Sequence, residues 1–133
     1  MPLAGEFVPE ERLSDIALYP MDLAVCEECT LVQILNVVAG EVLFTDYRYL
    51  SSVMVTLSNH FKDYARYLTE RVLPADDPFV VEFGCNDGVL LAPLKALGVK
   101  TVGVDAAANV VALTVERGHR VLHGFFGREI AAQ

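Results

Sequence analysis

The feature that most constrains the fold is an alternation of apolar runs and helical patterns in the second half of the chain. Residues 79–83, 100–104 and 120–123 are short apolar runs bounded by turn residues, as buried strands are. Helical patterns at 89–97 and 107–117 separate these runs, and each is followed by a glycine that suits a helix end. Strand, helix, strand, helix, strand with short connections predicts a parallel sheet with right-handed crossovers, in an α/β fold.

The first part of the chain has a different character. Residues 1–45 contain three prolines, a Cys-x-x-Cys pair and short apolar runs, which predict a small, loop-rich module of short strands and turns. From Leu50 onward the apolar positions are spaced by threes and fours, so one long helix is expected over 50–73, ending before Pro74. The predicted domains are therefore residues 1–45 and 46–133.

Composition limits the classes of partner. The 133 residues are 53% hydrophobic, enough for a packed core, and ten Lys and Arg against eighteen Asp and Glu give a net charge of −8. This negative field disfavours a nucleic-acid or anionic-membrane partner. No apolar stretch approaches the roughly 20 residues that cross a bilayer, and the first residues lack the basic start of a signal peptide. Three cysteines, an odd number, favour a reducing compartment, so a soluble cytoplasmic protein is expected.

Residues 82–88, Glu-Phe-Gly-Cys-Asn-Asp-Gly, lie between the first predicted strand and its helix, at the sheet edge where open α/β folds bind ligands. Gly84 allows the chain to turn off the strand, and Gly88 allows close approach to a ligand or to a packed helix. Asp105 ends the second strand, where a carboxylate can accept hydrogen bonds from both hydroxyls of a ribose. A bound nucleoside is predicted; ordinary turn glycines and a helix-capping aspartate are the alternative.

The absence of glycine at two positions of the loop excludes some classes of nucleoside ligand. Asn86 and Val89 stand where a dinucleotide fingerprint starting at Gly84 requires glycine, and the chain has no P-loop sequence. A glycine loop that begins with an acidic residue resembles the first motif of class I S-adenosylmethionine-dependent methyltransferases. The cofactor of these enzymes carries cationic sulfonium and ammonium groups, which interact favourably with carboxylates. The resemblance implies a cofactor site made of Glu82, Gly84, Cys85, Asn86, Gly88, Asp105 and Ala106.

Cys26 and Cys29 enclose two glutamates. The pair could be half of a zinc site, a redox pair or two inert thiols. The glutamates are expected to raise the pKa of the thiols and so oppose redox activation. Zinc takes four ligands, and the three histidines are not spaced as a second pair; they are His60, His119 and His123. We expect an incomplete zinc site at Cys26 and Cys29, with inert thiols as the alternative.

Three stretches extend the resemblance beyond the glycine loop. They are residues 19–33, which include the cysteine pair; residues 44–52, which read Phe-Thr-Asp-Tyr-Arg-Tyr-Leu-Ser-Ser and are followed by Asn59-His60; and residues 81–88 with 103–105. Together they make the chain similar to S-adenosylmethionine-dependent sugar C-methyltransferases of deoxysugar and antibiotic pathways. These join a small zinc-binding domain to a class I methyltransferase core. The expected fold is therefore a zinc-binding-like module followed by the first half of a Rossmann-like parallel sheet.

The resemblance also implies chemistry that needs further residues. Family members have an earlier Cys-x-x-Cys and carry a catalytic His and Glu later in the core, so a fragment of a longer enzyme, inactive alone, is expected. In the whole enzyme a base would remove a proton beside a ketone of a nucleotide-linked deoxysugar, and the enolate would attack the cofactor's methyl group. Tyr49 is the predicted donor to the enolate oxygen or a substrate contact. The alternative is that Tyr47 and Tyr49 only pack the module against the core.

Two functions from other classes are left open. One is a regulatory module that binds S-adenosylmethionine without chemistry, and the other is a zinc-ribbon interaction module whose glycine loop is incidental. Nucleoside binding without turnover would indicate the first, and metal dependence without nucleoside binding the second. The expected partner is a nucleotide-sugar substrate, which the sequence does not specify further, and the expected state is a monomer.

Overall fold

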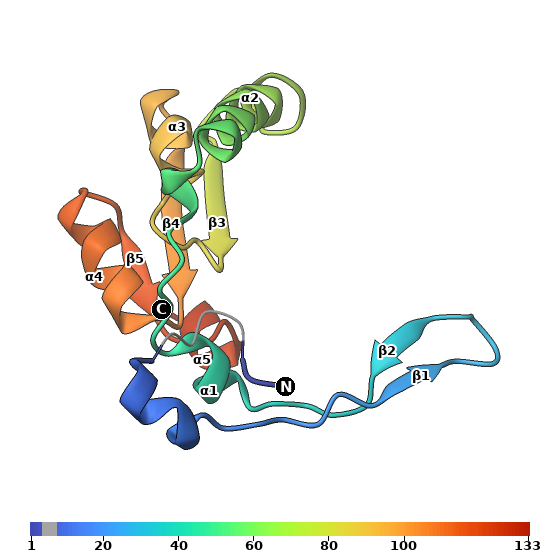
Figure 1. Ribbon diagram of the computed structural model, residues 1–133. Helices are drawn as coiled ribbons and strands as arrows, with labels where there is room; N and C mark the ends of the chain where they lie inside the picture. The colour runs from blue at the N-terminus through green and yellow to red at the C-terminus, as the bar shows by residue number, and fades with distance from the viewer. Residues whose placement is uncertain (4–7) are drawn as a thin grey trace. The chain divides into compact units, whose positions relative to one another are not determined.

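The computed structural model describes residues 1–3 and 8–133, which form two compact units, Met1–Leu43 and Phe44–Gln133 (Figure 1). The elements of the first unit are η1 (Glu10–Asp15), β1 (Leu23–Val25), β2 (Val32–Ile34) and α1 (Gly40–Phe44), whose last residue belongs to the second. The second unit contains η2 (Ser51–Val53), α2 (Val55–Arg71), β3 (Phe79–Phe83), α3 (Leu91–Ala96), β4 (Lys100–Asp105), α4 (Ala108–Glu116), β5 (Val121–His123) and α5 (Arg128–Ala131).

The first unit is built on an antiparallel hairpin. Strands β1 and β2 pair Leu23 with Ile34 and Val25 with Val32. The turn between them contains both cysteines of the Cys-x-x-Cys pair. None of the described residues of Met1–Leu43 is buried. The described part of this unit therefore has no buried core of its own.

The second unit contains a three-stranded parallel sheet in the order β3-β4-β5. Phe79 to Phe83 pair with Lys100 to Val104, and Gly103 to Asp105 pair with Val121 to His123. Each pair of strands is joined through a helix, as parallel pairing requires. The predicted α/β class with a parallel sheet is confirmed, and the carboxyl ends of β3, β4 and β5 meet at one edge.

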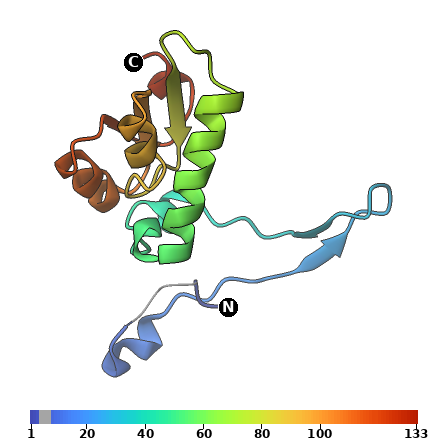
Figure 2. The ribbon, with the colours of Figure 1, turned by 90° about the horizontal axis from the view of Figure 1, so that it is seen from above.

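One face of the sheet is covered by helices. Helix α2 runs alongside β3 and lies next to α3 (Figures 1 and 2). The core between them consists of Ala65, Leu90, Leu94 and Val99, with Phe61, Leu68, Leu73 and Val80 packed against it. The side chains of Phe79 and Phe83, on the other face of β3, are 54% and 68% exposed. Parallel sheets are usually covered on both faces, so this apolar face lacks the usual cover among the described residues.

The long helix begins later than the sequence pattern indicates. The prediction was 50–73, whereas α2 begins at Val55 and is preceded by the short 3-10 turn Ser51–Val53. The reason is a hydrogen bond between a backbone amide before the helix and a side chain that is distant in the sequence. The amide of Ser51 donates to Asn86 Oδ1 at 3.0 Å, so the chain before Val55 is held outside the helix.

Candidate functional site

The glycine loop leaves β3 in a conformation that its residue types favour. Gly84 has a φ of +71°, in the left-handed region that glycine adopts without strain. The amides of Gly84 and Cys85 both donate to the carbonyl of Val104, at 2.8 and 3.2 Å. These bonds hold the loop against the end of β4, so the turn after the first strand lies beside the end of the second.

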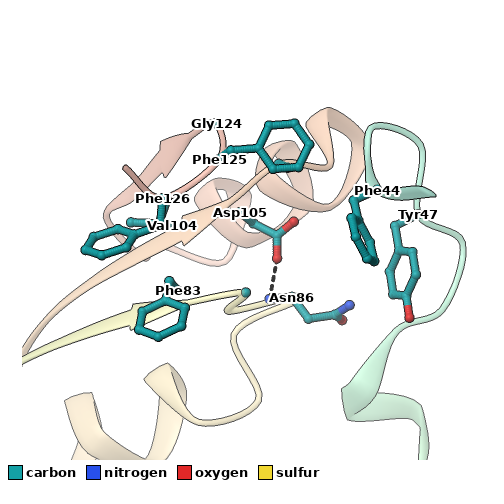
Figure 3. A pocket seen from close by; sticks show the side chains of 11 residues that line it. Phe44, Tyr47, Phe83, Asn86, Val104, Asp105, Gly124, Phe125 and Phe126 are labelled. Carbon is teal, nitrogen blue, oxygen red and sulfur yellow. Dashed lines mark hydrogen bonds between the residues drawn. The ribbon is translucent and has the colours of Figure 1, made fainter. Parts of the chain in front are cut away.

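Asp105 connects the loop to the end of β4. Its Oδ2 accepts from the amide of Asn86 at 2.9 Å (Figure 3), and its Oδ1 accepts from the amide of Ala107, beside the start of α4, also at 2.9 Å. Each carboxylate oxygen has a further lone pair after these bonds. Both oxygens are thus fixed in direction by backbone and can still accept from a ligand.

A cavity of about 450 Å³ lies at this edge of the sheet. Its lining is Phe44, Tyr47, Phe83, Gly84, Asn86, Val104, Asp105, Ala106, Gly124, Phe125 and Phe126 (Figure 3). The rings of Phe83 and Phe126 are stacked at 5.1 Å between centroids, and those of Phe44 and Tyr47 are tilted at 6.3 Å. A largely aromatic wall with one carboxylate and nearby backbone groups suits a flat heterocycle that carries hydroxyl groups.

The structure brings four of the seven expected cofactor residues into this lining, namely Gly84, Asn86, Asp105 and Ala106. Gly88 lies outside the lining, and a Cβ there would be 3.1 Å from the Thr114 methyl and 3.2 Å from the His119 ring. Gly88 therefore permits helix packing. Cys85 also lies outside the lining and is buried against Gly103.

Glu82, the third expected residue outside the cavity lining, is an unusual carboxyl. Its Oε2 atom is buried and has no hydrogen-bond partner among the described residues. Burial, followed by the charge of Asp105, raises the pKa of Glu82 to about 7. Burial and then the charges of Asp105 and Glu82 raise the pKa of the Cys85 thiol to about 12, so Cys85 is an unreactive thiol.

Of the two tyrosines in the Tyr-x-Tyr-x-Ser-Ser run, Tyr47 lines the cavity. The hydroxyl of Tyr49, the predicted catalytic residue, donates to Met54 Sδ at 3.1 Å, and its side chain is not part of the lining. Most of the lining residues that sequence reasoning missed are aromatic, namely Phe44, Phe83, Phe125 and Phe126; the others are Val104 and Gly124. Phe125 and Phe126 follow β5 after Gly124, and their position at a strand's carboxyl end was the signal that could have identified them.

The cysteine pair lies in the β1–β2 turn. The amide of Cys26 donates to Leu31 O, and that of Thr30 donates to Cys26 O, both at 2.9 Å. The backbone amides of Cys29 and then Glu28 lower the pKa of the Cys26 thiol. The expectation that the two glutamates raise it is therefore wrong for Cys26, because the turn directs amides at the sulfur.

This turn supplies two sulfur ligands of the kind that zinc prefers. Among residues 1–3 and 8–133, however, no group of three or more His, Cys, Asp or Glu is placed to hold a metal. His60 stacks on Tyr64, and His123 Nε2 lies 3.1 Å from the carbonyl of Ala106. The described residues therefore do not fit a complete zinc site, and no chemical step is derived through a metal.

The parallel sheet, the glycine loop and Asp105 define an α/β protein with a ligand cavity at its strand ends. Known proteins resemble the chain in both units. A family described as "Putative zinc binding domain" matches residues 1–44. C-methyltransferase NovU of Streptomyces niveus is 32% identical over 133 residues, covering 99% of this chain and 32% of that protein. The predicted resemblance to C-methyltransferases with an N-terminal zinc-binding domain is thereby confirmed.

Two further similarities are shorter. A type III pantothenate kinase of Dictyoglomus turgidum is 40% identical over 70 residues, covering 53% of this chain and 24% of that protein. The crystal structure of a SAM dependent methyltransferase from Archaeoglobus fulgidus matches with a TM-score of 0.42 at 20% identity, over 52% of this chain and 28% of that one. No functional conclusion follows from this structural similarity. The chain spans about a third or less of the curated relatives it matches.

Within residues 1–3 and 8–133, no helix is both long and apolar enough to cross a bilayer.

Proposed function

We propose that this chain is the cofactor-binding part of an S-adenosylmethionine-dependent C-methyltransferase, and that the cavity at the ends of β3, β4 and β5 holds the nucleoside of the cofactor. The observation that carries the proposal is the placement of Asp105. Its two oxygens are fixed by the amides of Asn86 and Ala107 at the rim of an aromatic cavity. The similarity to C-methyltransferase NovU supports the same conclusion.

The residues of the cavity have complementary tasks in this proposal. Asp105 would accept hydrogen bonds from the two ribose hydroxyls, and the rings of Phe125 and Phe126 offer an apolar surface for the adenine. The negative charge of Asp105 favours a ligand that carries positive charge. When bound, S-adenosylmethionine supplies an electrophilic methyl group; this chain's own residues bind and orient the molecule.

The finer assignment concerns the methyl acceptor. We propose a nucleotide-linked keto-deoxysugar that is methylated at carbon through an enolate, which requires a positioned base and a donor to the enolate oxygen. Tyr49 is kept as the candidate donor. Among the described residues its hydroxyl bonds the thioether of Met54, and thioether sulfur is a weak acceptor, so the hydroxyl could turn toward a substrate at little cost.

The test is calorimetric binding of S-adenosylhomocysteine to the chain and to Asp105→Asn. The variant keeps the size of the side chain but removes its charge, so binding should weaken by about 1.5–3 kcal/mol, or roughly 10- to 150-fold. Asp63→Asn, an exposed position on α2, is the matched control. Failure of the unaltered chain to bind would refute the proposed function. Equal affinity in Asp105→Asn would remove Asp105 from the site.

A further inference from the structure

Residues 45–52, which we call the strap, run past the glycine loop and include Tyr47 of the cavity wall. The strap is held through its backbone by side chains that are distant in sequence. Asn109 Oδ1 accepts from the amide of Tyr47 at 3.3 Å, and Asn109 Nδ2 donates to the Tyr47 carbonyl at 2.9 Å. Asn86 Nδ2 donates to the carbonyl of Tyr49 at 2.9 Å, and Asn86 Oδ1 accepts from the amide of Ser51 at 3.0 Å. The side-chain amides of Asn109 and Asn86 thus bond the backbone of every second residue of the strap from 47 to 51.

The end of the strap is held by a buried charge. Asp87 is almost completely buried, and its carboxylate accepts from the amide of Ser52 at 3.1 Å and from the Ser52 hydroxyl. Arg117 donates to the same carboxylate at 3.0 Å and to the Asp87 carbonyl at 2.7 Å. A buried carboxylate is costly unless it is paired and hydrogen-bonded, and both conditions are met here. The strap supplies two of the donors that make this burial acceptable.

The side chains that hold the strap come from the elements that form the proposed cofactor site. Asn86 and Asp87 belong to the glycine loop, and the amide of Asn86 bonds Asp105. Asn109 lies in the first turn of α4, two residues after Ala107, whose amide bonds the other oxygen of Asp105. The position of the strap and the position of Asp105 are therefore set by the same short stretches of chain.

We propose that Asn109, Asn86 and Asp87 are positioning residues that dock the strap as one wall of the cofactor cavity, with Asn109 fixing Tyr47 in that wall. This inference rests on the proposed function, because it assigns the strap's docking a role in binding the cofactor. A ligand that binds to an undocked strap must also order it, so loss of docking lowers apparent affinity even where the protein stays folded.

Two variants of Asn109 test the proposal. Asn109→Asp keeps an acceptor for the Tyr47 amide but replaces the donor to the Tyr47 carbonyl with an oxygen. A negative charge in the first turn of α4 favours the helix, so the melting temperature should stay the same or rise. The dissociation constant for S-adenosylhomocysteine should nevertheless rise about fivefold or more, the effect of one lost hydrogen bond. Asn109→Ala loses both bonds and should bind more weakly still.

Hydrogen exchange provides a readout that needs no ligand. In Asn109→Ala, amides of residues 45–52 should exchange faster while those of α2 and β4 keep their protection. Glu116→Ala, at an exposed position at the end of α4, is the control and should change neither exchange of the strap nor affinity.

The outcomes separate the two proposals. If the unaltered chain does not bind S-adenosylhomocysteine, the proposed function fails, and exchange of the strap then decides whether Asn109 positions it. If the unaltered chain binds and both Asn109 variants bind as tightly, the role of the strap in binding is overturned. Strap exchange in Asn109→Ala equal to that of the unaltered chain would overturn the positioning role itself.

Discussion

The protonation of Glu82 makes the stability of this protein depend on pH in the direction opposite to that of an ordinary ion-paired carboxylate. Burial and the charge of Asp105 raise the pKa of Glu82 from 4.5 to about 7. Between these two pH values, the folded chain therefore holds a proton that the unfolded chain has released. The contribution of Glu82 to stability is therefore fully present below pH 4.5, falls as the pH rises, and is lost above pH 7.

Replacing Glu82 with Gln removes this dependence, because the amide does not titrate. The rise in the pKa of Glu82 corresponds to an upper limit of about 3.5 kcal/mol, at about 1.4 kcal/mol per pH unit. The difference in free energy of unfolding between Glu82→Gln and the unaltered chain should therefore shift in favour of the variant by about 2–3 kcal/mol between pH 4 and pH 8.5. His119, whose pKa is lowered by burial and nearby cations, contributes equally to both proteins and cancels.

Urea denaturation followed by circular dichroism at several pH values measures this difference. Glu116→Gln, an exposed glutamate on α4, should show no such shift relative to the unaltered chain. Parallel pH profiles for Glu82→Gln and the unaltered chain would refute the reasoning, because they would mean that Glu82 is ionised in the folded state at the same pH as in the unfolded state.

Two further predictions concern packing and the buried ion pair. Gly103→Ala should destabilise the chain by roughly 1–3 kcal/mol, because its Cβ would lie 2.6 Å from Cys85 Sγ and 2.9 Å from Leu91 Cδ1; a thermal midpoint equal to that of the unaltered chain would contradict this. Arg117→Ala should cost roughly 3 kcal/mol by removing the cation that pairs with Asp87, and urea denaturation showing a loss below about 0.5 kcal/mol would exclude a structural role for the pair.

The sheet and its glycine loop could be predicted from sequence because their signals are local. Each strand is a short apolar run ended by turn residues, and Asp105 is placed at the strand edge by its position in the chain alone. Residues 79–83 are a strand with the predicted bounds, and the second strand extends one residue further, to Asp105. Parallel pairing then brings Asp105 beside the loop without any knowledge of side-chain contacts.

The docking of the strap could not be predicted, because the side chains of Asn86, Asp87 and Asn109 that dock it lie 35 to 62 residues away in the chain. Nothing in the order of Tyr47 and Tyr49 tells which of them faces the cavity. Asn109 sets which tyrosine faces the cavity, because its side chain bonds both the amide and the carbonyl of Tyr47. The same long-range bonds at Ser51 explain why the helical periodicity from Leu50 was misleading.

A segment that is held mainly through its main chain leaves the side chains between the bonded positions free to change. Asp46 and Arg48 lie between the bonded positions of the strap, and both are exposed. Substitutions there should leave the docking bonds in place and alter only what the rim of the cavity presents to an incoming molecule. Under the proposed function, the strap is therefore a place where related chains can differ in the surface that they present to a methyl acceptor without first losing the fold.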